Sequence, residues 1–259
     1  MVARLFGFFP FWGALVLGAA GSLGAVLSAQ PPLGPRAAEE GRPVPDGLGV
    51  PASLSAADTF GNPVELPRPE PAVRRVLERG NVRFVFYDGD RQPRLFPGKT
   101  ELDLKFKYHA RTEWEVPASR GVRILVIRPD YDRIDWILDH QIELPASLVS
   151  ADFFADALVQ HELDHVRISA DPRIERLFRD RVRKNIQEIR IPWESDQPPL
   201  KSIVQQHVDR AIVAEFKQVL QFLQIRYREL DRVTKHGLSR LPGGFLEDAP
   251  DLERASSSR

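Results

Sequence analysis

The sequence predicts an α+β fold in which a sheet from the first half of the chain packs against helices from the second half. Between residues 82 and 144, short runs rich in β-branched and aromatic residues are separated by Gly, Asp and Pro clusters, which is typical of strands joined by turns. Between residues 150 and 233, apolar residues recur at the spacing of amphipathic helices. The length of 259 residues suits one globular domain with attached terminal segments.

The chain opens with a hydrophobic segment that predicts export. Arg4 precedes an apolar run from Leu5 to Ala29, whose last residues are small. A basic start, an apolar centre and a small-residue end are typical of a secretory signal. The run is also long enough to span a bilayer as an uncleaved anchor. We interpret residues 1–29 as a signal peptide or membrane anchor, and we expect the protein to be secreted, periplasmic or membrane-anchored.

The next segment, residues 30–71, is dense in Pro, Gly, Ala and Ser and has no hydrophobic periodicity. This composition predicts a linker with little core of its own. The folded domain is expected to span residues 72–242 and to open with a short helix near Pro71–Leu77. Residues 243–259 are polar and are expected to form a disordered tail.

Four strands are expected in the first half of this domain. Val82–Tyr87 and Leu102–Tyr108 alternate apolar and polar residues, most regularly in the second. Val122–Ile127 is apolar and β-branched, and Pro129 is expected to end it. Trp136–Leu144 is expected to form a further, separate strand.

The first long helix carries the main chemical signal. Ser150 is its expected N-cap, with Asp152 in the first turn. Residues 161–165 have the pattern H-E-x-x-H, which places two imidazoles on one helix face, one turn apart. His161 and His165 can bind one Zn²⁺, and Glu162 can act as general base on a metal-activated water. The alternative is a buried, hydrogen-bonded histidine pair without a metal.

Two further helices are expected after the break at Asp171-Pro172. Residues 174–189 predict an amphipathic helix, and residues 200–233 predict a long one that ends near Gly237. Basic residues outnumber acidic ones between residues 167 and 190. This segment is interpreted as a solvated, salt-bridged helix face, with a contact surface for anionic lipid or polymer as the alternative.

The composition narrows the class of function. Lys+Arg and Asp+Glu both number 36, so no overall field favours a nucleic-acid partner, and none is expected. The chain has no cysteine, which excludes disulfides, thiol catalysis and cysteine-ligated zinc. His, Asp and Glu side chains are left as the metal ligands.

A catalytic zinc ion needs a third protein ligand, and the residues by themselves leave four candidates. Asp171 has the spacing of a compact metzincin site, but Ile168 replaces the glycine that its turn requires. Glu215 suits the arrangement in which a later helix supplies a glutamate. His207, on the same helix, and His236, beyond its end, complete the set.

The last of these candidates belongs to a segment with a family resemblance. The H-E-x-x-H helix, followed by two helices and then by D-x-x-T-x-H-G at residues 231–237, resembles the predicted secreted zinc-dependent proteases of the DUF922 family. The resemblance covers roughly residues 82–237. It implies that His161 and His165 are ligands, that Glu162 is the general base and that His236 is the third ligand.

The resemblance also implies roles for neighbouring residues. Asp231 and Thr234 would orient His236, and Gly237 would allow the backbone turn that brings His236 to the metal. The family commonly has a tyrosine directly before the aspartate, where this chain has Leu230. Tyr227, one helical turn earlier, is the candidate replacement as a donor to a transition-state oxyanion.

The fold that the resemblance implies is zincin-like, with a small antiparallel or mixed sheet packed on the H-E-x-x-H helix and further helices supplying the third ligand. The expected activity is Zn²⁺-dependent hydrolysis of peptide or protein substrates. Part of Ile134–Leu144 is the candidate strand edge that holds the substrate, and any of the other strands could also serve. The alternatives are a non-catalytic metal-binding envelope or interaction protein, and a zinc amidase that acts on a cell-wall polymer. No sequence feature specifies an oligomeric state.

Overall fold

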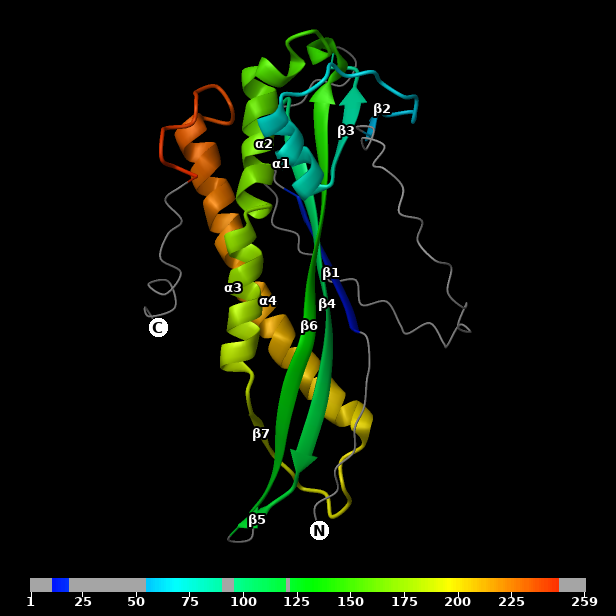
Figure 1. The fold of residues 1–259 in the computed structure, drawn as a ribbon, viewed down its shortest axis with the longest axis vertical. Coiled ribbons are helices and arrows are strands. Elements are labelled where there is room, and N and C mark those ends of the chain that lie inside the picture. Colours follow the sequence, from blue (N-terminus) through cyan, green and yellow to red (C-terminus); the bar gives the residue numbers. More distant parts are fainter. Residues whose placement is uncertain (1–10, 19–54, 90–95, 120–121, 247–259) are drawn as a thin grey trace.

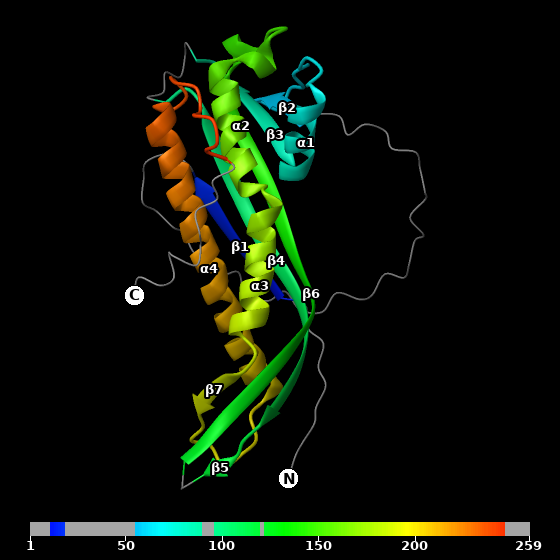
Figure 2. The same ribbon diagram turned by 60° about the vertical axis from the view of Figure 1, so that its left-hand side comes forward.

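The computed structural model describes residues 11–18, 55–89, 96–119 and 122–246, and it has the expected α+β architecture (Figure 1). A mixed sheet forms one layer, and the helices α2, α3 and α4 lie along one side of it (Figure 2). The helices are α1 (Pro71–Gly80), α2 (Ala157–Ser169), α3 (Pro172–Asn185) and α4 (Lys201–Thr234). Two short 3₁₀ turns, Ala146–Leu148 and Phe153–Ala155, precede α2.

The sheet has the strand order β1-β4-β6-β3-β2, and β5 and β7 also pair with β6. Two strand pairs are parallel, β2 with β3 and β3 with β6. The other pairs are antiparallel: β1 with β4, β4 with β6, β5 with β6 and β7 with β6. The strands are β1 (Phe11–Gly18), β2 (Ser55–Asp58), β3 (Val82–Tyr87), β4 (Lys99–Glu115), β5 (Ala118–Ser119), β6 (Val122–Pro145) and β7 (Ile189–Pro192).

The two longest strands, β4 and β6, pair along the centre of the sheet, and their register shifts between His109 and Ala110. The prediction of two separate strands at 122–127 and 136–144 was wrong, because β6 continues through Pro129. A proline is tolerated where its missing N–H costs no ladder bond. β7 pairs with β6 only up to Ile127, and β3 only from His140, so residues 128–139 have β4 as their strand partner among the described residues.

The helix that carries the H-E-x-x-H motif starts later than expected. Its N-cap is Asp156, not Ser150, because the Asp156 carboxylate accepts the backbone N–H groups of Leu158 and Val159 at 2.8 and 3.3 Å. The next helix, α3, is shorter than expected. It ends at Asn185 and not at residue 189, because residues 189–192 form β7.

Three expectations concern the ends of the chain. Residues 55–58, placed within the predicted linker, form β2 with a buried Ala56, so the ordered fold begins before residue 72. Within the predicted leader, residues 11–18 form β1, and the rest of residues 1–29 lies outside the described residues. None of the described helices is long and apolar enough to cross a membrane. At the other end, the tail prediction beyond residue 246 also lies outside the described residues.

Two hydrophobic clusters form the core. The larger is built by β4, β6, α3 and α4, with Leu104, Phe106 and Phe178 at its centre. The smaller is built by α1, α2 and β3, with Phe84 and Phe153 among its fully buried residues. α2 contributes to both clusters, which places it at their junction.

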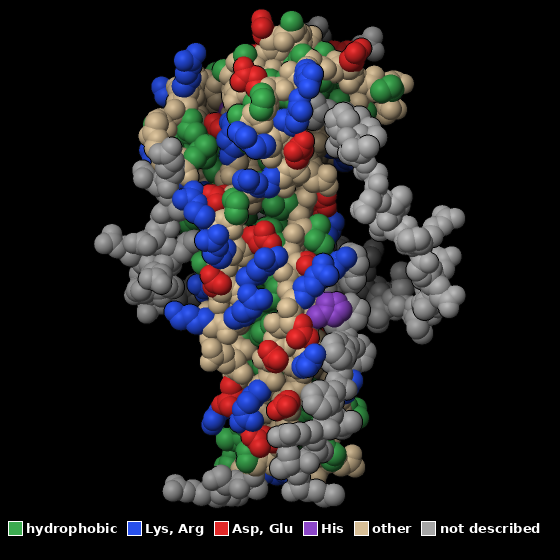
Figure 3. Space-filling view, in the orientation of Figure 1, with side chains coloured by type: hydrophobic (Ala, Val, Ile, Leu, Met, Phe, Trp, Pro, Cys, Tyr) green, Lys and Arg blue, Asp and Glu red, His purple; other side chains and the backbone are tan. Residues whose placement is uncertain are grey.

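The arginine-rich segment 167–190 carries ion pairs along its length. Arg167 pairs with Asp164, Arg179 with Glu175 and Arg181 with Glu215. Basic and acidic side chains interleave over this face of the molecule (Figure 3). This pattern agrees with a salt-bridged helix face, and binding to anionic lipid stays untested.

Candidate metal centre

His161 and His165 lie on the side of α2 that faces the C-terminal end of α4. Both are almost fully buried, at 5% and 2% exposure, and their ring centroids are 4.9 Å apart. Asp231 reaches them from α4: its Oδ1 lies 3.3 Å from Nε2 of His161 and 3.1 Å from Nε2 of His165. Within the described residues, these three form a group whose ligand atoms all lie within 4.8 Å of one another.

The two distances from Asp231 are compatible with a tetrahedral metal ion, and equally with hydrogen bonds from the imidazoles. Zinc bonds of about 2.0–2.1 Å to nitrogen and oxygen place neighbouring ligand atoms about 3.3 Å apart in a tetrahedron. Both measured distances from Asp231 Oδ1 are close to that value. Burial raises the pKa of Asp231, but hydrogen bonds and positive charge from the two histidines outweigh it and hold that pKa below its ordinary value. A carboxylate that stays ionised is a competent ligand.

Thr234 sets the tautomer of His161. The Thr234 hydroxyl donates to the backbone oxygen of Leu230 at 2.7 Å, so its oxygen accepts from His161 Nδ1 at 3.1 Å. With its proton on Nδ1, a neutral His161 points the Nε2 lone pair at the Asp231 carboxylate. Two acceptor atoms at this separation repel each other unless a proton or a metal cation lies between them, so this arrangement is compatible with a protonated His161 or with a bound cation.

The turn after α4 brings this segment close to α2. Lys235, His236 and Gly237 all have positive φ, at 51°, 56° and 86°. A Cβ on Gly237 would lie 3.1 Å from Cβ of His161, so this position needs glycine both for its backbone conformation and for the close approach.

Glu162 lies on α2 beside the histidine group and is 3% exposed. Burial raises the pKa of its carboxyl above the ordinary value, while the nearby His165 and a hydrogen bond from Thr100 act in the opposite direction. The Thr100 hydroxyl donates to Glu162 Oε2 at 2.6 Å. A buried carboxyl with a raised pKa next to a candidate metal group has the properties of a general base.

His236, which the family resemblance implies as third ligand, lies beside the group of three. Its side chain is half exposed, its Nδ1 is 3.8 Å from Asp231 Oδ1, and its ring packs on Phe96 at 4.4 Å. The carboxylate that contacts both imidazoles is Asp231, to which the family resemblance assigned an orienting role. Ligation by His236 stays a prediction.

The other three candidate ligands are not in this group. Glu215 pairs with Arg181 and accepts from Asn185. Asp171 caps α3 by accepting the backbone N–H of Arg173. His207 precedes Asp231 by 24 positions on α4, which is about 36 Å along a helix axis.

Tyr227, the candidate oxyanion donor, packs against the ring of His165 with centroids 4.7 Å apart. Its hydroxyl is buried, and burial raises its pKa, while a contact with the Ser169 hydroxyl acts in the opposite direction. The Nδ1 atom of His165 is buried without a hydrogen-bond partner among the described residues. Tyr227 therefore lies behind a histidine of the group, and its role as a donor to substrate stays a prediction.

Sequence reasoning missed a third buried histidine, behind α2. His140 on β6 donates from Nδ1 to the backbone oxygen of Gly80 at 2.5 Å and contacts the Ser169 hydroxyl through Nε2 at 2.6 Å. Burial lowers its pKa to about 4. The strand pattern places His140 among buried positions, but nothing in the sequence pairs it with Ser169.

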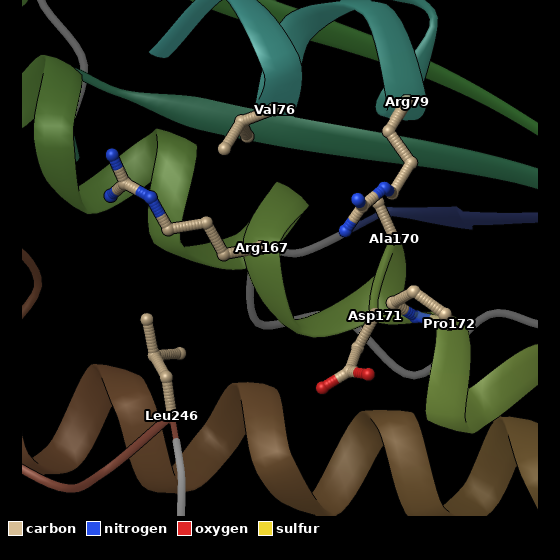
Figure 4. Close-up of a pocket in the computed structure, with 7 residues that line it drawn as sticks. All are labelled: Val76, Arg79, Arg167, Ala170, Asp171, Pro172 and Leu246. Atoms are coloured by element: carbon tan, nitrogen blue, oxygen red, sulfur yellow. The ribbon is translucent and has the colours of Figure 1, made fainter. Parts of the chain in front are cut away.

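Two surface pockets lie away from the histidine group. One, of about 280 Å³, is lined by residues of α1, α2 and α3, including Arg79, Arg167 and Asp171, together with Leu246 (Figure 4). The other, of about 540 Å³, lies along α4 between Gln206 and Lys217. Solvent reaches the histidine group on the side of Asp231 and His236, whose side chains are 25% and 50% exposed.

Comparison with known proteins adds no assignment. No protein family, no curated protein and no solved structure matches the chain. The resemblance to the DUF922 family thus has no support beyond the two segments that suggested it. What can be concluded is an α+β fold with a buried His161, His165 and Asp231 group that could hold a metal ion.

Proposed function

We propose that this protein is a zinc-dependent hydrolase of peptide bonds. The observation that carries the proposal is the convergence of the two motif histidines and Asp231, with the buried carboxyl of Glu162 beside them. A purely structural metal site has no need of a second carboxyl that does not bind the metal and has a raised pKa, as Glu162 does.

The donor set favours zinc among the common metals. Two imidazoles and one carboxylate are a known ligand set of catalytic zinc sites, which keep one position open. Harder cations such as Mg²⁺ and Ca²⁺ prefer sites made of oxygen atoms. In this proposal His161, His165 and Asp231 would hold the ion, which would supply Lewis acidity to the substrate carbonyl and to a water molecule.

The protein residues carry the proton transfers. Glu162 takes a proton from the attacking water and returns it to the leaving nitrogen, so the peptide C–N bond breaks with the addition of one water and no covalent enzyme intermediate. Thr234 keeps His161 in the tautomer that leaves Nε2 free. Substrate enters from the solvent-accessible side at Asp231 and His236.

The test uses the full chain, purified and dialysed, with metal content measured by elemental analysis. We expect near-stoichiometric zinc and hydrolysis of unstructured protein substrates. Glu162→Gln should retain zinc and lose at least about 100-fold in kcat, the usual contribution of general-base catalysis. A wild-type chain that binds no zinc would contradict the proposal. A zinc-loaded chain that cleaves only cell-wall amides would change the substrate class and keep the chemistry.

A structural metal site is the second candidate, and the burial of the group favours it. His161, His165 and Glu162 are each no more than 5% exposed. Such a site joins α2 to α4 and binds metal with no turnover. Stoichiometric zinc with no hydrolysis of peptides or cell-wall amides would select this candidate.

A further inference from the structure

The carboxyl of Glu162 packs against residues at the start of β4. Gly98 directly precedes this strand and Thr100 is its second residue, so the two alternate positions lie on the same side of the chain. Thr100 is 1% exposed. The contact between Thr100 and Glu162 joins residues 62 positions apart, and neither Gly98 nor Thr100 belongs to a motif that the sequence singled out.

Thr100 contacts Glu162 in two ways. Its Oγ1 lies 2.6 Å from Oε2 of the carboxyl and 3.2 Å from the backbone oxygen of the same residue. A hydroxyl has one proton, and the shorter contact to an ionised group is the stronger one. The same hydroxyl can accept from a protonated carboxyl while it donates to the backbone oxygen. It is therefore a partner for Glu162 both before and after proton transfer.

Gly98 closes the other side of the carboxyl. A Cβ at this position would lie 2.9 Å from Cδ of Glu162 and 2.8 Å from Cδ1 of Leu158, and it would overlap Glu162 Oε1. The absence of a side chain lets the backbone approach the carboxyl directly. A side chain at this position would require the Glu162 carboxyl or the backbone at Gly98 to shift.

We infer that Gly98 and Thr100 are positioning residues that fix the orientation of the Glu162 carboxyl, Thr100 by a hydrogen bond and Gly98 by its lack of a side chain. This inference rests on the proposed role of Glu162 as general base. A base must be held within hydrogen-bonding distance of the proton that it takes, so a small displacement lowers the rate of the chemical step more than it weakens substrate binding.

Thr100→Val tests the hydrogen bond, because valine keeps the shape of threonine and removes the hydroxyl. We expect kcat to fall about 10- to 100-fold, at the lower end of the general-base contribution, with KM changed less than about twofold. Zinc content should not change. Thr100→Ser restores the hydroxyl and should recover most of kcat. Thr112→Val, a buried threonine near the far end of β4, is the matched control and should leave kcat unchanged.

Gly98→Ala is an independent test that does not depend on how Thr100→Val folds. It should lower kcat with zinc retained. Gly243→Ala is the control, because a Cβ there would meet nothing within 4 Å. Wild-type kcat in either Thr100→Val or Gly98→Ala would overturn the corresponding part of the inference.

Crystal structures of the metal-free variants provide a readout that needs no activity. The Glu162 carboxyl should move in Thr100→Val and Gly98→Ala and keep its place in Thr100→Ser. An unmoved carboxyl in the first two variants would overturn the inference. A wild-type chain that binds zinc and cleaves nothing would refute the proposed function instead, and the crystal structures would still decide whether these residues position Glu162.

Discussion

At the scale of single residues, α2 is held by specific hydrogen bonds on the side opposite the candidate metal group. His140 bridges the backbone oxygen of Gly80 and the hydroxyl of Ser169, which in turn contacts the backbone oxygen of His165 at 3.1 Å. Through this chain of contacts, β6 holds the C-terminal turn of the helix that carries both histidines. Burial requires this imidazole to be neutral rather than charged, and the neutral ring donates from Nδ1 and accepts at Nε2.

This requirement gives the stability a pH dependence. Burial lowers the pKa of His140 to about 4 from an ordinary value of 6.5, so on acidification the unfolded chain binds a proton before the folded protein does. The contribution of the neutral His140 to the free energy of unfolding is complete above pH 6.5, and it is lost as the pH falls towards 4. The loss amounts to about 3 kcal/mol over that window. Urea unfolding of wild type and His140→Gln at pH 7 and pH 4.5 should show this loss only in wild type.

His109→Gln is the control, because this histidine lies on β4 and is partly exposed. It should retain the pH dependence of wild type. An equal pH dependence in wild type and His140→Gln would show that the buried imidazole is not the group that titrates.

At the scale of secondary-structure elements, helix boundaries depend on the side chains that cap them. Ser150 and Asp156 both have residue types that suit an N-cap, and hydrophobic spacing extends over both starting points. In the structure a 3₁₀ turn at 153–155 separates them, and Asp156 accepts two backbone N–H groups. The start of α2 was therefore decided by the local backbone path, which the spacing of apolar residues does not specify.

Substitution of the two residues distinguishes these starting points. Asp156→Ala removes the cap and the favourable charge at the helix N-terminus, and should lower the free energy of unfolding by about 1 kcal/mol. Ser150→Ala should change it by less than about 0.5 kcal/mol, as for most surface positions. Denaturant unfolding monitored by circular dichroism measures both. A larger loss in Ser150→Ala would contradict the observed helix start.

The bounds of the strands, like the start of α2, were not specified by the pattern of apolar residues. Leu102–Tyr108 was recognised from its alternation, yet β4 extends beyond this stretch at both ends. Pro129 was taken as a strand end, and β6 passes through it. Residues 140–143 of β6 pair with strands on both sides, so they are not the open edge that the sequence suggested for substrate. Strand length and edge position follow from pairing partners, which single-chain patterns do not reveal.

At the scale of the whole molecule, the candidate metal group lies where two cores meet. α2 packs into the smaller core and, through Ile168, into the larger one, to which α4 also belongs. An ion held by His161, His165 and Asp231 would therefore tie α2 to α4. Metal binding should stabilise the entire fold, since its free energy is added to that of the folded state only.

Removal of metal should lower Tm. At a free zinc concentration of 100 times Kd, binding contributes about 2.7 kcal/mol, which corresponds to about 5–10 °C in a chain of this size. Calorimetry of the chain with zinc and with chelator measures this difference. Asp231→Asn should abolish most of the difference, whereas His236→Asn should retain it. The reverse result would make His236 the third ligand.

The sequence by itself determined the α+β class, the helical placement of the H-E-x-x-H pair and the extent of α4, because each depends on local periodicity. It also pointed to the segment 231–237 near the site. Only the tertiary structure decided that Asp231 lies between the imidazoles while His236 lies beside them, and that Thr100 meets Glu162. The physical reason is that residues 62 to 73 positions apart meet through packing of elements, whose rotation and depth depend on the whole core.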